Sequence, residues 1–147
     1  IYKSSVSIFT EVFSSFPEIG HASELIKKWQ RIREIRSEIT KAIEIEREAG
    51  KIGSSLQADL AIQLNSADFK LMKSIGADLR FVTITSKVEI LESKENSISV
   101  TVKPSTHQKC ARCWHHTSDV GSHAEHPDLC GRCISNLYGD GEVRQFA

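Results

Sequence analysis

Two pairs of cysteines near the end of the chain constrain its fold more than any other feature. Cys110 and Cys113 form one C-x-x-C pair, Cys130 and Cys133 form a second, and sixteen residues separate the two pairs. One C-x-x-C turn offers two sulfurs to a single ion, and two such turns at a separation of about 15–20 residues are typical of zinc sites. The spacing predicts one structural zinc ion held by four thiolates, with no open position for catalysis.

Three other interpretations of the cysteines remain open on the residues alone. A histidine can replace one thiolate, the site can hold iron in a rubredoxin-like way, or the pairs can form two disulfides. Disulfides need an oxidising compartment, and the sequence shows neither a secretory or transit segment nor an apolar run of membrane-spanning length. We therefore expect a cytoplasmic protein without membrane contact. Because the chain begins at Ile1 without a methionine, we expect it to be a fragment of something longer.

The segment from Pro104 onward differs in composition from the rest of the chain. It has few aliphatic residues, and five of the six histidines fall between positions 107 and 126. Such a segment cannot fold on an apolar core alone, so metal binding would supply the missing stability. The intervening histidines, His115, His116, His123 and His126, are interpreted as loop residues or as support for the cysteines.

Hydrophobic patterning predicts an α+β fold in front of this segment. Apolar residues at helical spacing, Leu25, Trp29, Ile32, Ile39 and Ile43, predict a long helix over 23–49, with Ser23 as N-cap and Gly50 as terminator. Strands are predicted at 56–64, 79–90 and 97–102, and a short helix at 66–76 with Ser66 as its cap. Residues 1–20 are expected to be an extended segment packed on a neighbour. The predicted domains are 1–50, 51–103 and 104–147.

Charge excludes only one class of nucleic-acid binder. Nineteen basic and nineteen acidic residues give a net charge of zero, so a histone-like protein is excluded and any contact with nucleic acid needs a local patch. The first half of the predicted long helix carries such a patch, although charge runs are usually a solvated surface with i,i+4 ion pairs. Basic residues here oppose the helix dipole, which favours a ridge facing phosphates as a second interpretation. The patch consists of Lys27, Lys28, Arg31, Arg33 and Arg36.

Longer motifs resemble a known family. The string KCARCWHHTSDVGSHAEHPDLCGRCISNLYGDGEVRQFA, from Lys109 to Ala147, resembles the C-terminus of bacterial-type isoleucyl-tRNA synthetases, which are class I enzymes. The stretches SIFTEVFSSFPE, GKIGSSLQADL and LRFVTITSKV are similar to the same region, so the resemblance covers essentially the whole chain. It implies the tail of a helical anticodon-binding domain, a small α/β junction and a C-terminal zinc domain.

The resemblance also implies functions for individual residues. Cys110, Cys113, Cys130 and Cys133 would be the zinc ligands, and Arg112 and Trp114 would reach anticodon bases of tRNA(Ile). Aromatic rings and guanidinium planes suit this task because unpaired loop bases are read by stacking. The pair His115–His116 departs from the His-aromatic pair usual in the family.

The catalytic function would lie outside this chain. A parent synthetase would use ATP to ligate isoleucine to tRNA, yet the HIGH-like and KMSKS-like motifs occur nowhere in the sequence. The alternative is a free-standing zinc-ribbon-like module that binds RNA or protein and has no ligase parent. A dithiol redox enzyme is disfavoured, because it needs one C-x-x-C beside a βαβ unit rather than two at zinc spacing.

Overall fold

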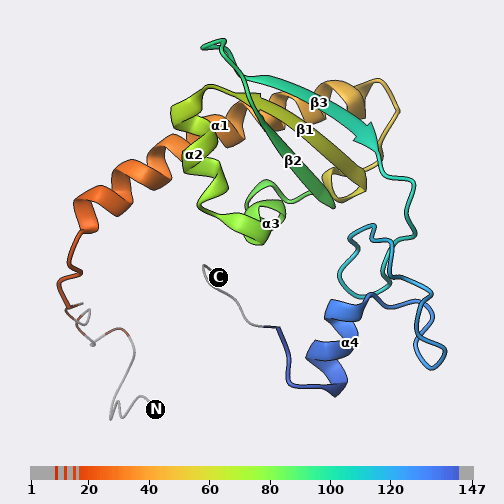
Figure 1. Cartoon of the computed structure of the whole chain (residues 1–147). Coiled ribbons are helices and arrows are strands. Elements are labelled where there is room, and N and C mark those ends of the chain that lie inside the picture. The colour runs from red at the N-terminus through yellow and green to blue at the C-terminus, as the bar shows by residue number, and fades with distance from the viewer. Residues whose placement is uncertain (1–8, 10–11, 13–14, 16, 143–147) are drawn as a thin grey trace.

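A three-stranded sheet covered by helices forms the first of two structural units. The computed structural model describes residues 9, 12, 15 and 17–142; the extended segment predicted for 1–20 therefore lies largely outside the described residues. The helices are α1 (Ala22–Glu48), α2 (Ser66–Lys73), α3 (Leu79–Thr83) and α4 (Gly131–Tyr138), with 3-10 turns at Ser55–Gln57 and Gly76–Asp78. The strands are β1 (Ala58–Leu64), β2 (Lys87–Glu92) and β3 (Ser99–Pro104). The predicted α+β class is confirmed (Figure 1).

The central strand, β1, pairs with β2 in parallel and with β3 in antiparallel orientation. Ile62 lies opposite Ile90 on one side and Val100 on the other, so these residues share one face of the sheet. The burial of β1 alternates in the same register, and all of its even-numbered residues are buried. The helices therefore cover one face of the sheet, and the second face carries polar residues such as Gln63 and Lys87.

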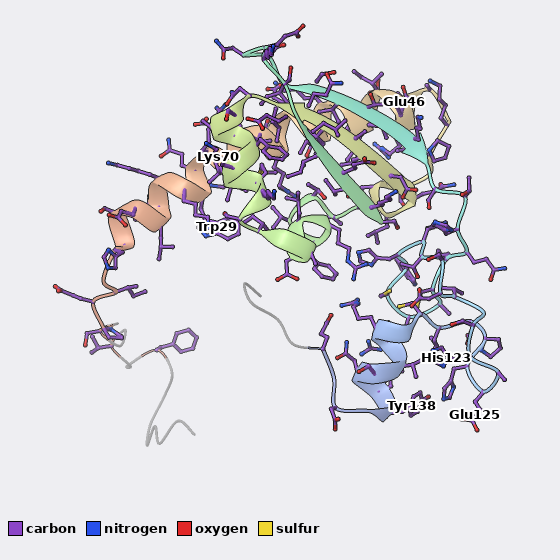
Figure 2. All side chains as sticks on the ribbon, viewed as in Figure 1. Trp29, Glu46, Lys70, His123, Glu125 and Tyr138 are labelled. Atoms are coloured by element: carbon purple, nitrogen blue, oxygen red, sulfur yellow. The ribbon has the colours of Figure 1, made fainter. Side chains whose placement is uncertain are left out.

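Helix α1 supplies the other half of this core. Its buried stripe is Ile32, Ile35, Ile39 and Ile43, which recur every three or four residues and pack against β1 and Met72 of α2. The stripe begins near the middle of α1, at Ile32, and the turns before it project beyond the sheet (Figure 1; Figure 2 adds the side chains in the same view). Leu25, which the helical pattern placed among the apolar positions, is exposed for this reason.

Both ends of α1 follow from local backbone geometry. The predicted cap, Ser23, is wrong: the helix begins after His21, whose backbone is left-handed at φ 63°. At the other end Gly50 has φ 72°, its N–H donates to the Arg47 carbonyl, and Lys51 N–H donates to the Glu46 carbonyl. These two bonds define a Schellman motif, for which glycine is favoured because it has no Cβ.

Two further predictions about secondary structure are wrong. Asn65 rather than Ser66 caps α2, because its side-chain oxygen accepts from the N–H groups of Ala67 and Asp68. The strand predicted over 79–90 begins only at Lys87, and residues 79–83 form helix α3. The hydroxyl of Thr83 returns a hydrogen bond to the Leu79 carbonyl, and the chain leaves α3 through Ile84 at φ 57°. Tertiary packing of Leu79 in the core overrides the β-propensity of this stretch.

The second unit follows β3 and is built around cysteines. It lies beyond the end of the sheet at which β3 stops and β2 begins (Figure 1). Its buried cluster is Cys110, Cys130 and Cys133, against which Cys113, Val120 and Leu129 pack. Among the described residues, no helix combines the length and apolar character needed to cross a membrane.

Candidate metal centre

The first cysteine pair sits on a tight backbone turn. Cys110 N–H donates to the His115 carbonyl at 2.9 Å, and Trp114 N–H donates to the Cys110 carbonyl at 3.0 Å. Lys109 and His116 form the next bridge outward, so the turn closes as a short hairpin. Trp114 occupies a left-handed conformation at φ 66°, which a bulky residue adopts only when its surroundings enforce it. The hairpin therefore fixes both cysteines and the residues between them.

The second pair starts a helix. Cys130 is the N-cap residue of α4 and Cys133 lies in its first turn. Gly131 N–H donates to Oδ2 of Asp119 at 2.7 Å, so a carboxylate from the intervening loop caps the helix. A Cβ on residue 131 would lie 2.9 Å from that same oxygen, so a larger residue here would displace the capping carboxylate. Ala111 N–H donates to the Asp128 carbonyl and ties the first turn to the second.

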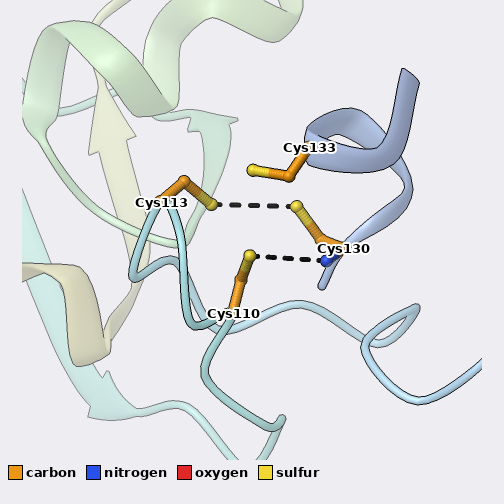
Figure 3. Close-up of side chains that lie close together, drawn as sticks. All are labelled: Cys110, Cys113, Cys130 and Cys133. Atoms are coloured by element: carbon orange, nitrogen blue, oxygen red, sulfur yellow. Dashed lines mark hydrogen bonds between the residues drawn. The ribbon is translucent and has the colours of Figure 1, made fainter. Parts of the chain in front are cut away.

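The four sulfur atoms converge on one point (Figure 3). All of them lie within 4.8 Å of one another, and Cys113 Sγ is 3.7 Å from Cys130 Sγ. Zinc–sulfur bonds of about 2.3 Å in a tetrahedron place neighbouring sulfurs about 3.8 Å apart, whereas a disulfide bond is about 2.05 Å long. All four cysteines are free. The arrangement fits one tetrahedral ion and excludes the disulfide interpretation.

Backbone N–H groups prepare one thiol for metal binding. Burial of Cys110 favours the neutral thiol, but N–H groups of Cys113, Cys130 and Arg112 together outweigh this effect and lower its pKa to about 6. The Cys130 N–H lies 3.4 Å from the Cys110 sulfur (Figure 3). Burial raises the pKa of Cys130 to about 12 and also raises that of Cys133. Cysteines bind metal as thiolates. Because burial keeps Cys130 and Cys133 neutral, a bound cation would be needed to ionise them.

Arg112 adds a positive group at the edge of the site. Its Nη1 donates to Cys133 Sγ at 3.7 Å, although the two residues belong to different turns. Four thiolates around a divalent ion carry two net negative charges, and a guanidinium beside them offsets part of this charge. Sequence motifs had suggested Arg112 only as a base contact; its bond to the cysteine was not foreseen.

Trp114 points outward from the same turn. It is 59% exposed, and the Lys109 ammonium lies 5.5 Å from the centroid of its ring. The structure thus brings Arg112 and Trp114 to the metal centre, as their positions beside Cys113 require. Lys109 was missed as a functional candidate, although its place directly before the first cysteine was the available signal.

The basic residues of α1 lie elsewhere. In Figure 1 the amino half of α1 is at the opposite end of the molecule from α4. Lys27 is exposed and Lys28 is half-buried. Arg31 donates from Nε and Nη2 to the Asp68 carboxylate at 2.8 and 2.7 Å, and from Nη1 to Glu34 at 2.7 Å. The guanidinium of Arg31, which the charge pattern suggested as a phosphate contact, is therefore engaged in a structural ion pair.

An aromatic anchor joins the metal centre to the sheet. Phe81 of α3 meets the ring of His115 edge-on at 5.5 Å, and Arg132 of α4 lies over the Phe81 ring at 4.9 Å. Ser86 adds a polar link, since its hydroxyl accepts from His116 N–H at 2.6 Å and donates to the Leu56 carbonyl. The two units are therefore held in a defined orientation. No sequence signal pointed to Phe81 or Ser86.

The fold and the site define a small α+β protein with a zinc finger. Residues 108–136 match the family described as "Zinc finger found in FPG and IleRS", and this span contains all four cysteines. The family assigns zinc to the ion that the sulfur geometry accommodates. The predicted zinc cofactor is thereby confirmed.

The chain as a whole is similar to the C-terminal part of bacterial isoleucine–tRNA ligases. It is 48% identical over 144 residues to the isoleucine–tRNA ligases of Burkholderia vietnamiensis (strain G4 / LMG 22486) and Burkholderia cenocepacia (strain HI2424). In both comparisons the match covers 97% of this chain and 15% of the relative. The resemblance drawn from the motifs is confirmed, and the chain spans about 15% of the length of these relatives.

Proposed function

We propose that this chain is the anticodon-binding end of an isoleucyl-tRNA synthetase. Its zinc module would contact the anticodon stem-loop of tRNA(Ile), and the rest of the synthetase would use ATP to ligate isoleucine to that tRNA. Support comes from the similarity to isoleucine–tRNA ligases over 97% of the chain. The structural observation that carries the proposal is Trp114, which is 59% exposed on a turn that the metal makes rigid.

Trp114 suits the recognition of an unpaired base. Its ring is a flat surface for stacking, and the left-handed backbone of the hairpin fixes where it points. The ammonium of Lys109, 5.5 Å from the ring, adds a positive charge at the same place. Arg112 is the second proposed base contact, since its bond to Cys133 uses one N–H and leaves the other guanidinium donors for a base.

Contacts to phosphate would come from α1. Lys27 and Lys28 are the proposed donors, and Arg31 belongs to the same set. Because Asp68 and Glu34 already oppose the charge of Arg31, we expect Lys27 to contribute more to the electrostatic attraction. Phosphate contacts carry no sequence information, whereas base contacts do.

The test compares binding of the chain to tRNA(Ile) and to the same tRNA with an altered anticodon over a salt series. Trp114→Ala should weaken cognate binding by about 1–3 kcal/mol and reduce discrimination, with zinc retained. Tyr138→Ala, which removes another exposed aromatic ring of the module, is the matched control. Lys27→Ala should weaken both tRNAs equally and flatten the salt dependence. Full discrimination by Trp114→Ala would reject the assigned base contact, and absence of any tRNA binding would favour a free-standing zinc module.

A further inference from the structure

The four cysteines of the metal centre differ in their access to solvent. Cys113 is partly exposed, whereas Cys110, Cys130 and Cys133 are at most 3% exposed. A cavity of about 400 Å³ also lies beside the centre, and Cys113 is one of the residues that line it. A small molecule that approaches the metal centre from solvent would therefore meet Cys113 before any other ligand.

A cysteine that holds zinc is also in its reactive form. Metal ligands are thiolates, and the thiolate is the form of cysteine that reacts with oxidants. Oxidation of cysteine follows thiolate character and exposure, and Cys113 combines both when zinc is bound. The cavity carries the cations Arg80, Lys87 and Arg132 as well as the carboxylate of Asp119. Hydrogen peroxide is uncharged, so its entry does not depend on the balance of these charges.

A second sulfur lies within reach of the first. Sγ of Cys113 is 3.7 Å from Sγ of Cys130, although the two residues belong to different turns (Figure 3). A disulfide bond is about 2.05 Å long, so the two sulfurs would need to approach by about 1.65 Å. Cys110 is the alternative partner, but its buried sulfur lies 3.4 Å from the Cys130 N–H, a contact that a bond to Cys113 would disturb. The geometry therefore favours a disulfide across the two turns.

We propose that Cys113 is a site of reversible oxidation by hydrogen peroxide and that Cys130 is its disulfide partner. The Cys113 thiolate attacks one peroxide oxygen; an S–O bond forms, the O–O bond breaks, and hydroxide leaves and is protonated by solvent. This step oxidises the sulfur to a sulfenic acid and reduces the peroxide. The Cys130 thiolate then attacks that sulfur; the S–S bond forms, the S–O bond breaks, and a second hydroxide leaves. The centre loses two of its four ligands and with them the zinc ion. The proposal does not depend on RNA binding.

Trypsin can locate the disulfide, because it cleaves after lysine and arginine. It leaves Cys113 and Cys130 together in peptide 113–132 and separates both from Cys110 and Cys133. The zinc-loaded chain is treated with hydrogen peroxide, zinc release is followed with a chromogenic chelator against a sample without peroxide, and the remaining thiols are blocked during denaturation. We expect one zinc ion to be released for each pair of thiols lost, with peptide 113–132 lighter by two hydrogen atoms and not linked to another peptide. A dithiol reductant followed by zinc should restore the four thiols and the bound ion.

Two variants separate the proposed partner from the general loss of one ligand. In Cys130→Ser this disulfide cannot form, so dimedone, which labels sulfenic acids, should label Cys113 more strongly than in Cys133→Ser. In Cys133→Ser, which also removes one ligand, peptide 113–132 should still lose two hydrogen atoms. If either variant fails to hold zinc, the peptide map of the unaltered chain decides alone.

Two results would overturn the inference. Peroxide-treated chain in which peptide 113–132 is mainly linked to the peptide of Cys110 or of Cys133 would show that the pairing is wrong. Retention of zinc and of all four thiols, at a peroxide concentration that oxidises free glutathione, would show that Cys113 is not an oxidation site. Either result leaves the proposed function standing.

Discussion

The guanidinium of Arg112 donates to the sulfur of Cys133 across 3.7 Å, linking the two cysteine turns through a side chain. Arg112 belongs to the hairpin of the first turn and Cys133 to the first turn of α4. A hydrogen bond to a metal-bound thiolate lowers its charge density and holds it in place. Arg112 therefore stabilises the metal centre from outside the ligand set, whatever it contributes to binding RNA.

Loss of the Arg112 side chain should lower the affinity of the site for zinc. We expect Arg112→Ala to lower zinc affinity by about 10-fold, at the lower end of the range for groups that support metal ligands, and to speed zinc release. Release to a chromogenic chelator, followed over time, measures both effects. Arg33→Ala, at an exposed site on α1, is the control for the loss of one charge. Equal release rates in the two variants would show that the bond to Cys133 has no energetic role.

The metal centre was predictable because its information is local. Two C-x-x-C turns specify ligand type and spacing within 24 residues, and the sulfurs converge as that spacing predicts. The supporting groups were not predictable, since Phe81 and Ser86 reach the module from positions about 30 residues earlier. Their contacts depend on how the two units dock, which no periodicity encodes.

The elements of the sheet show the same limit. Alternation located β1 and β3, because half-buried strands show their two faces in the sequence, whereas the general position of β2 came from a stretch rich in β-branched residues. The β-propensity failed at residues 79–83, which form α3 because the chain must cross from the helical layer back to the sheet. The helical spacing used to predict α1 left out Ile35, which is fully buried although Glu34 and Arg36 flank it in the sequence.

Zinc removal should unfold one unit and spare the other. The module after Pro104 has cysteines as its buried core, whereas the sheet and α1 share an aliphatic core. With a strong chelator, we expect protease cleavage within 105–142 while 22–104 stays protected. Mass spectrometry of the fragments identifies the cut sites. Equal cleavage throughout both regions would contradict two separable cores.

Acid should weaken the contact between α1 and α2. Hydrogen bonds from Arg31 are the main cause that lowers the pKa of Asp68, against the opposing effect of burial, and Asn65 adds to the lowering. The depressed pKa means that this pair stabilises the fold above the ordinary carboxyl pKa, and that the contribution is lost as pH falls through the lower folded value. Arg31→Ala should cost about 1–2 kcal/mol at pH 7, a figure reduced for the partial exposure of Arg31.

The pH dependence separates this effect from a general loss of charge. The stability difference between the unaltered chain and Arg31→Ala should begin to shrink as pH falls below about 4, where a carboxyl of the unfolded chain is protonated, and should be lost as pH falls through the lower pKa that Asp68 has in the folded chain. Arg33→Ala is the control, because it would lose zinc in acid to the same extent as Arg31→Ala. Its stability difference from the unaltered chain should not change with pH. Denaturant unfolding followed by circular dichroism at pH 7, 5 and 3 provides the comparison. A difference that stays constant from pH 7 to pH 3 would contradict the assigned role of Asp68.

Ser86 should transmit stability between the zinc module and the sheet. Its hydroxyl accepts from His116 N–H in the module and donates to the Leu56 carbonyl, just before β1. Ser86→Ala leaves both backbone groups without this partner, at a cost of about 1–3 kcal/mol. More specifically, zinc binding should raise the unfolding midpoint of the sheet in the unaltered chain and raise it less in Ser86→Ala.

The measurement is denaturant unfolding of each protein with and without zinc, with the signal of α1 and the sheet as readout. Ser74→Ala is a suitable control, because that exposed hydroxyl donates only to the local Leu71 carbonyl at the end of α2. It should keep the full zinc-dependent shift of the midpoint. If Ser86→Ala also keeps that shift, the hydrogen bonds of Ser86 contribute nothing to the coupling between the two units. The edge-on contact of His115 with Phe81 then carries the coupling instead.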